Sequence, residues 1–328
     1  MTLKKAVEQL MVSAQDDSST PDDLYPLAQT VFDEARKHSR ASVEEALRDL
    51  AAGLALSHAG KAGVIGMCIG AFLEGGCSPK EVQGPILSRL GEVLHRAEAL
   101  MQECPDPEAL SEDCVAALDD LELFWRPAIA LFSVSPEARR EAAPLLPAFN
   151  SLAEQHEGAH WLSKIIPVLH EEPVVVLEPA TGLGIEGTLS GVVDNFQLHV
   201  LLMDTFPQKG LFKRKRTSDR IIAVAKGEGP QTAEESVEGA WNLYTHQALL
   251  ADLSLSEASE NWIWGEGTPA DIPILEDRRV ILLGPPTYRR TWNSMRMFDA
   301  LKADLKVTRV LNERQVRSWL ERITNRDE

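Results

Sequence analysis

The sequence predicts two domains: an all-helical N-terminal domain over residues 1–170 and a mixed α+β (α/β) domain over residues 171–328. The first reason is length, because 328 residues exceed what one hydrophobic core usually serves. The second is a change of pattern at residues 167–173, where helical periodicity gives way to runs of β-branched residues. The composition, 44% hydrophobic and 25% charged, is ordinary for a globular protein.

The N-terminal half carries apolar residues at a spacing near 3.6, as in Val82, Ile86, Leu90 and Val93, which predicts six to eight helices. Capping-box patterns predict helix starts at Ser42 and Ser78, and a Ser-Pro pair predicts one at Ser135. The most apolar segment, residues 62–73, is too short to cross a bilayer, which takes about 20 residues. We therefore expect a buried helix there, with glycines 63, 66 and 70 allowing close approach of its neighbours.

The C-terminal half predicts strands separated by helices. A turn at residues 179–182 joins the first two strands as a hairpin. Asp194 and Asn312, each followed three residues later by Gln, predict two helix starts. The predicted strands are 173–177, 185–193, 220–225, 278–283 and 306–311, with a weaker one at 239–246.

Charge is distributed unevenly around the net value of −17. Residues 1–170 hold 14 Lys and Arg against 26 Asp and Glu, a net −12. Residues 278–326 hold 12 basic and 4 acidic residues, a net +8. An acidic N-terminal half makes nucleic acid an improbable partner, because phosphate binding needs a basic surface. The basic segment is suited to an acidic surface, in the same chain or in another copy.

The N-terminus and the cysteines predict a cytoplasmic location. Residues 1–17 lack the apolar run and cleavage site of a signal peptide. The four cysteines form no CxxC pair, which favours free thiols in a reducing compartment. We expect no membrane association.

One short motif has a specific chemistry. His156, Glu157 and His160 match HExxH, in which two histidines one helical turn apart share a Zn²⁺ and the glutamate acts as general base. The pattern is similar to that of the zincin metallopeptidases. The resemblance implies a zinc-dependent hydrolase with His156 and His160 as metal ligands and Glu157 as the catalytic base.

The chain departs from the zincin pattern in several positions. The longer form has Gly and His where this chain has Ser163 and Ile166. The shorter form needs a downstream acid, for which Glu178 lies at a suitable separation. The structural alternative is an exposed polar helix face with one histidine at the domain junction.

Two further motifs each allow a binding site or a simpler structural role. Residues 182–187 read GxGxxG, with Asp204 where a dinucleotide site has its ribose-binding acid. That site needs a helix to begin at the third glycine, whereas the next helix start is Asp194, so a hairpin is favoured. The basic stretch 209–220, with Phe212 as a stacking ring, suits phosphate or nucleic acid but is more typical of a solvated loop.

The segment WIWGEGTPADIP, residues 262–273, is the second candidate site. Trp262 and Trp264 lie two residues apart and share one face of a strand, while Ile263 faces the other way. The favoured interpretation is a rigid crossover whose tryptophans cover the sheet. The alternative is a ring-lined binding surface. Its candidate residues are Trp262, Trp264, Glu266, Asp271, Arg289 and Arg290.

The leading functional hypothesis is an intracellular interaction or regulatory protein with a helical scaffold domain. It carries no complete catalytic constellation in its sequence, and its expected partner is another protein or a second copy. The alternative is the zinc-dependent hydrolase described above, for which zinc is the implied cofactor.

Overall fold

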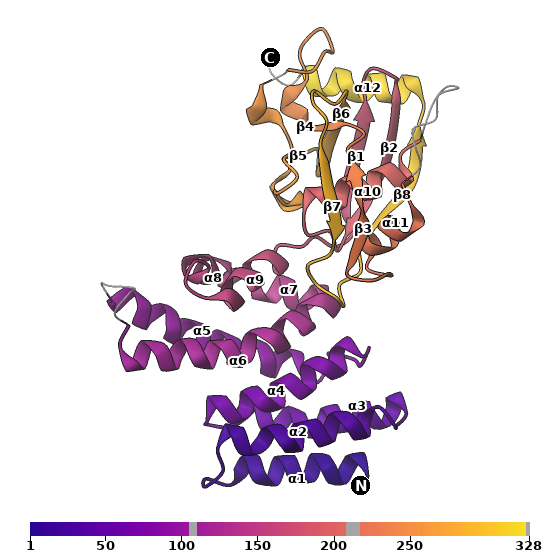
Figure 1. Ribbon diagram of the computed structural model, residues 1–328. Helices are drawn as coiled ribbons and strands as arrows, with labels where there is room; N and C mark the ends of the chain where they lie inside the picture. The colour runs from indigo at the N-terminus through magenta and orange to yellow at the C-terminus, as the bar shows by residue number, and fades with distance from the viewer. Residues whose placement is uncertain (105–109, 208–216, 257, 326–328) are drawn as a thin grey trace. The chain divides into compact units, whose positions relative to one another are not determined.

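The computed structural model describes residues 1–104, 110–207, 217–256 and 258–325. The chain forms two compact units, Met1–Pro167 and Val168–Glu328. The first is helical and the second combines helices with a mixed sheet, in the order that the sequence predicts (Figure 1). We call them the N-terminal and C-terminal units.

The described residues of the N-terminal unit hold nine α-helices, more than the six to eight predicted. Part of the difference lies at Pro144 and Pro147, where proline lacks a backbone donor and short helical pieces replace a longer one. The helices are α1 (Leu3–Gln15), α2 (Pro21–Ala35), α3 (Arg40–Ala51), α4 (Ala59–Glu74), α5 (Gln83–Glu103), α6 (Glu112–Val134), α7 (Pro136–Ala142), α8 (Leu146–Leu152) and α9 (Glu157–Ile165).

One of the three predicted helix starts in this unit is confirmed. Ser135 caps α7 through its hydroxyl, which accepts from the Ala138 N–H at 3.1 Å. The start predicted at Ser42 is wrong, because the Ser39 hydroxyl accepts from the Ser42 N–H and α3 begins earlier. The start predicted at Ser78 is also wrong: residues 79–82 form a bend and a turn, and α5 begins at Gln83.

The apolar segment 62–73 lies in α4 and is buried, as predicted. A Cβ added at Gly63 would lie 2.5 Å from the Leu123 side chain on α6. One added at Gly70 would lie 3.1 Å from the Pro127 Cα, so these glycines let α4 and α6 pack closely. None of the described helices has both the length and the apolar character that crossing a bilayer requires.

The C-terminal unit is built on a mixed sheet in the order β4-β6-β1-β2-β8, with the short β5 paired to β6. Strands β1 and β6 are parallel, and the other pairs in this sheet are antiparallel. β3 and β7 form a separate antiparallel ribbon. The strands are β1 (Glu172–Glu178), β2 (Leu183–Ser190), β3 (Thr232–Glu238), β4 (Asn242–Thr245), β5 (Ile274–Leu275), β6 (Arg278–Gly284), β7 (Thr291–Met295) and β8 (Asp304–Leu311).

Both faces of the sheet are covered. Helices α10 (Asn195–Thr205) and α11 (Asp219–Lys226) share a hydrophobic core with one face, which includes Val176 and Ile281. Helix α12 (Glu313–Thr324) shares a second core with the other face, through Trp319 among others (Figure 1). Alternate strand residues therefore enter opposite cores.

The strand predicted at residues 220–225 is wrong, because these residues form α11. The Ser218 hydroxyl caps its start by accepting from the Ile221 N–H, and Gly227 ends it at φ 72°. This local capping and burial of one helix face outweigh the β-preference of the Ile-Ile pair. The helix starts predicted at Asp194 and Asn312 are confirmed.

Candidate functional site

The HExxH segment lies at the start of α9, with His156 outside the helix. His156 has extended backbone angles and is the N-cap residue, and its Nδ1 accepts from the Ala159 N–H at 3.1 Å. The side chain is only 7% exposed. One imidazole nitrogen is therefore used to cap the helix.

The second imidazole nitrogen of His156 faces α6. Since Nδ1 accepts a hydrogen bond, the neutral ring carries its proton on Nε2. Nε2 lies 3.6 Å from a Glu122 carboxylate oxygen. Burial lowers the pKa of His156 below its ordinary value of 6.5, and the attraction of Glu122 offsets only part of that effect. The fold therefore favours the neutral imidazole.

The other motif residues also have contacts within the fold. The Glu157 carboxylate accepts from Trp161 Nε1 at 3.1 Å. A Cβ at position 158 would lie 2.3 Å from the Trp125 ring, so glycine is required there. His160 is exposed, and its ring meets the edge of Trp161 at 5.1 Å between centroids.

Glu178, the acid suggested as a third ligand, is buried at the end of β1. Its carboxylate accepts from Trp241 Nε1 at 2.8 Å and from the Thr181 hydroxyl. Among the residues that the structure describes, no three His, Cys, Asp or Glu side chains are grouped in a way that could hold a metal ion. A zinc site at His156 and His160 with Glu157 as base stays a prediction.

The hairpin interpretation of residues 182–187 is confirmed. Gly182 lies in the turn at φ 67°, and β2 begins at Leu183 and pairs antiparallel with β1. Asp204 binds Lys226 Nζ at 2.8 Å. Of the basic stretch 209–220, residues 209–216, including Phe212, lie outside the described residues.

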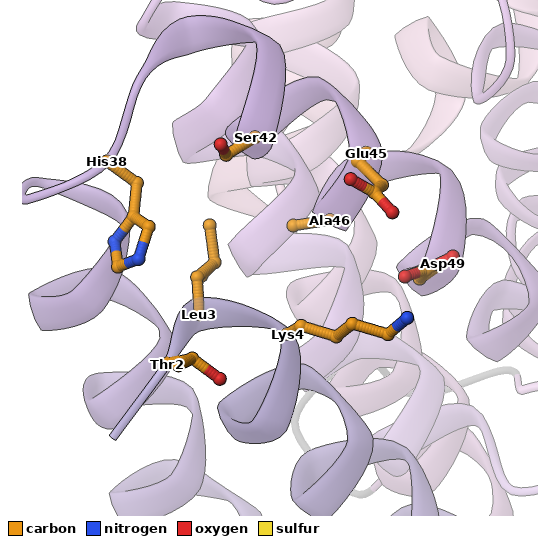
Figure 2. Close-up of a pocket in the computed structure, with 8 residues that line it drawn as sticks. All are labelled: Thr2, Leu3, Lys4, His38, Ser42, Glu45, Ala46 and Asp49. Atoms are coloured by element: carbon orange, nitrogen blue, oxygen red, sulfur yellow. The ribbon is translucent and has the colours of Figure 1, made fainter.

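A small hollow lies on the N-terminal unit between the start of α1 and α3. Figure 2 shows its lining, in which Leu3 and Ala46 lie beside the charged side chains of Lys4, Glu45 and Asp49. It encloses about 160 Å³. Small-molecule sites usually enclose roughly 300–1,000 Å³, so this hollow is too small to be a strong candidate.

The tryptophans of the second candidate segment form part of a ring cluster in the C-terminal unit. The centroids of Trp262 and Trp264 lie 5.2 Å apart, and Tyr288, from the connection between β6 and β7, lies 6.3 Å from Trp262. Trp262 is half-buried and packs on the core beneath α12, while Ile263 enters the opposite core. Trp264 is 45% exposed and Tyr288 46% exposed. The predicted covering role therefore holds for Trp262 and not for Trp264.

Arg290 joins the two exposed rings. Its guanidinium carbon lies 5.8 Å from the Trp264 centroid and 5.2 Å from the Tyr288 centroid, within the range of cation–π attraction. Its Nε also donates to the Tyr288 hydroxyl at 3.2 Å. We call the group Trp262, Trp264, Tyr288 and Arg290 the aromatic–arginine surface.

The backbone beneath this surface is fixed by the first turn of α10. The Gly265 carbonyl accepts from the N–H groups of Asn195 and Phe196, both at 3.1 Å. The Trp264 carbonyl accepts from Asn195 Nδ2 at 2.8 Å. A Cβ on Gly265 would lie 2.3 Å from the Phe196 ring, so only glycine allows this approach. The segment thus supplies acceptors to the N–H groups of the first turn of α10, which have no acceptors within the helix itself.

Two further contacts anchor the edges of the surface. The Ile263 N–H donates to the Leu243 carbonyl of β4 at 2.8 Å. The Gly239 N–H donates to the Arg290 carbonyl at 2.9 Å. The tryptophans and Arg290 therefore extend from backbone that is hydrogen-bonded to α10, to β4 and to the β3–β4 connection.

The structure does not gather all the predicted binding residues here. Arg289 points to a carboxylate of β3, pairing with Glu238 at 3.1 Å. Glu266 and Asp271 are exposed and make no ion pair with Arg290 among the described residues. Tyr288 was missed by the sequence reasoning, although it immediately precedes the two arginines that were selected.

Asp194 lies beneath the same segment as the N-cap of α10. Its carboxylate accepts from the Gln197 N–H at 2.7 Å. Burial raises the pKa of Asp194 above its ordinary value of 3.8, the hydrogen bonds oppose that rise, and the nearby charge of Glu266 adds to it. The fold therefore disfavours the ionised form of Asp194, which lies beneath the aromatic–arginine surface.

Comparison of the chain with known protein families, curated proteins and solved structures found no match.

Proposed function

We propose that the chain is an interaction protein that binds another protein through the aromatic–arginine surface. The observation that carries the proposal is the pair of exposed rings, Trp264 and Tyr288, whose centroids lie 5.8 and 5.2 Å from the guanidinium carbon of Arg290. Trp, Tyr and Arg are the residue types that dominate the binding energy of protein interfaces. Here the three types lie in one ordered cluster.

The order of the cluster supports a binding role. An exposed flexible side chain loses conformational freedom when a partner immobilises it, at a cost of about 0.5–1.5 kcal/mol per side chain. In this surface the rings contact each other and the backbone is hydrogen-bonded to α10 and β4. Much of that ordering cost is met during folding, which favours binding.

The proposal is tested by affinity capture with the full chain and three variants. Trp264→Ala and Tyr288→Ala each remove one exposed ring. Tyr25→Ala removes a ring from the N-terminal unit that is similarly exposed, at 41%, and serves as the matched control. We expect the first two variants to lose the captured partner and the third to retain it. Equal capture by all three would refute the proposal.

A further inference from the structure

We infer that the aromatic–arginine surface recognises an acidic peptide segment of another protein, with Arg290 pairing with a carboxylate of that segment and the rings contacting its apolar residues. The inference rests on the proposed function and adds the chemistry of the partner. Its starting point is the charge of Arg290, which no carboxylate of the described residues neutralises.

Five other arginines of this unit have carboxylate partners, whereas Arg220, Arg278, Arg314 and Arg317 have none among the described residues. The adjacent Arg289 pairs with Glu238, and Arg279, near the start of β6, pairs with Glu172 at 3.0 Å. Arg290 instead contacts two rings and the Tyr288 hydroxyl. Further pairs in the unit are Arg296–Asp299, Arg309–Glu186 and Arg322–Glu276.

The geometry leaves the guanidinium able to take a carboxylate. A guanidinium has five N–H donors in a planar fork that matches the two oxygens of a carboxylate. Nε and Nη2 each direct one donor at the Tyr288 hydroxyl, which leaves the second donor of Nη2 and both donors of Nη1 for a partner. Because the rings already orient the group, pairing requires less ordering than it would for a solvated arginine.

The charges at this surface also favour a peptide over a nucleic acid as the partner. Stacking rings beside an arginine suit nucleobases as well, but binding a phosphate backbone needs several unpaired cations. The neighbouring Arg289 is neutralised by Glu238. One available cation beside two exposed aromatic rings fits a single carboxylate flanked by apolar side chains.

The test uses an array of decapeptides composed of Leu, Ser, Pro and Glu, with a twin array in which every Glu is replaced by Gln. The full chain is applied to both, and dissociation constants for the best pair are then measured by fluorescence anisotropy. We expect the Glu peptide to bind at least 10-fold more tightly than its Gln twin. Arg290→Gln should abolish that preference, whereas Arg289→Gln should preserve it.

The controls separate this inference from the proposed function. Trp264→Ala should weaken binding of both twins, since the ring contacts the apolar residues. If Trp264→Ala weakens binding but the Glu and Gln twins bind equally, the preference for an acidic partner is refuted, while the proposal that the surface binds a protein is retained. If no peptide binds in a Trp264-dependent way, or if only oligouridine or a second copy of the chain does, the inference is overturned. Unchanged thermal unfolding of Arg290→Gln excludes misfolding as the cause.

Discussion

The HExxH segment of the N-terminal unit and the tryptophan segment of the C-terminal unit use their residues in opposite ways. In the first, the side chains serve the fold: His156 caps α9 and Glu157 binds Trp161. In the second, the backbone serves the fold through the carbonyls of Trp264 and Gly265, and the Trp264 side chain extends into solvent. A residue type that suits a chemistry is informative only when the fold leaves its reactive or binding group available.

The largest expected effect comes from the glycine in each segment. Gly158→Ala places a methyl group against Trp125, and Gly265→Ala places one against Phe196. Each should destabilise its own unit by about 1–3 kcal/mol, as overpacking does. Gly91→Ala in α5 meets nothing within 4 Å and should stabilise by roughly 0.5–1 kcal/mol, because alanine favours helix. Urea unfolding followed by circular dichroism measures all three.

The two glycine variants also sharpen the contrast in function. Gly265→Ala should weaken partner capture, since the displaced backbone carries Trp264. Gly158→Ala should leave capture intact at temperatures where the chain stays folded. Loss of capture in both variants, or in neither, would contradict the division between a structural segment and a binding segment.

Substitution of the two histidines of the HExxH segment should change the free energy of unfolding by different amounts. His156→Ala removes the N-cap acceptor and should cost about 1 kcal/mol in the free energy of unfolding. His160→Ala changes an exposed side chain and should stay within roughly 0.5 kcal/mol. Metal analysis of the same proteins tests the alternative hypothesis: bound zinc that both variants lose would establish a metal site and make the capping account incomplete.

The pH dependence of stability follows from the lowered pKa of His156. The folded state disfavours the imidazolium, so the unfolded chain binds this proton more readily. The contribution of His156 to the free energy of unfolding is complete above the unfolded pKa of about 6.5 and is lost as the pH falls from that value through the lowered folded pKa. His156→Asn keeps an N-cap acceptor without titrating. Unfolding free energies at pH 8 and pH 5.5 should therefore converge in the variant, and an unchanged pH dependence would contradict the assignment.

A smaller effect of opposite sign is expected at Asp194. Its pKa is raised, so the ionised carboxylate is less stable in the fold than in the unfolded chain. That penalty is absent below pH 3.8 and complete above the raised pKa. Asp194→Asn keeps an acceptor for the Gln197 N–H and should raise the melting temperature slightly at pH 7 but not at pH 3. A lower melting temperature at pH 7 would show that the charge itself stabilises α10.

Local sequence patterns predicted much of the fold and little of the aromatic–arginine surface. The starts at Ser135, Asp194 and Asn312 and the hairpin after β1 are set by side chains close in sequence. The strand predicted at 220–225 failed because capping and burial decided against β-propensity.

The aromatic–arginine surface depends on contacts distant in sequence. Asn195 lies 69 residues from Trp264, the residue whose carbonyl it binds. No rule of sequence spacing predicts that Trp262 contacts Tyr288. Nor does the sequence show that Arg289 pairs with Glu238 while Arg290 contacts the rings. Trp262 and Trp264 could be selected from sequence because their alternation implies a shared face, whereas the exposure of only one depends on packing.

Binding of a partner through the C-terminal rings can be tested by photo-crosslinking. A photoreactive phenylalanine is placed at Tyr288 in one protein and at Tyr25 in another, two positions with nearly equal exposure. We predict adducts with the partner from position 288, lost when Trp264→Ala is added, and none from position 25. Adducts from position 25 alone, or adducts at 288 that persist without Trp264, would contradict the account.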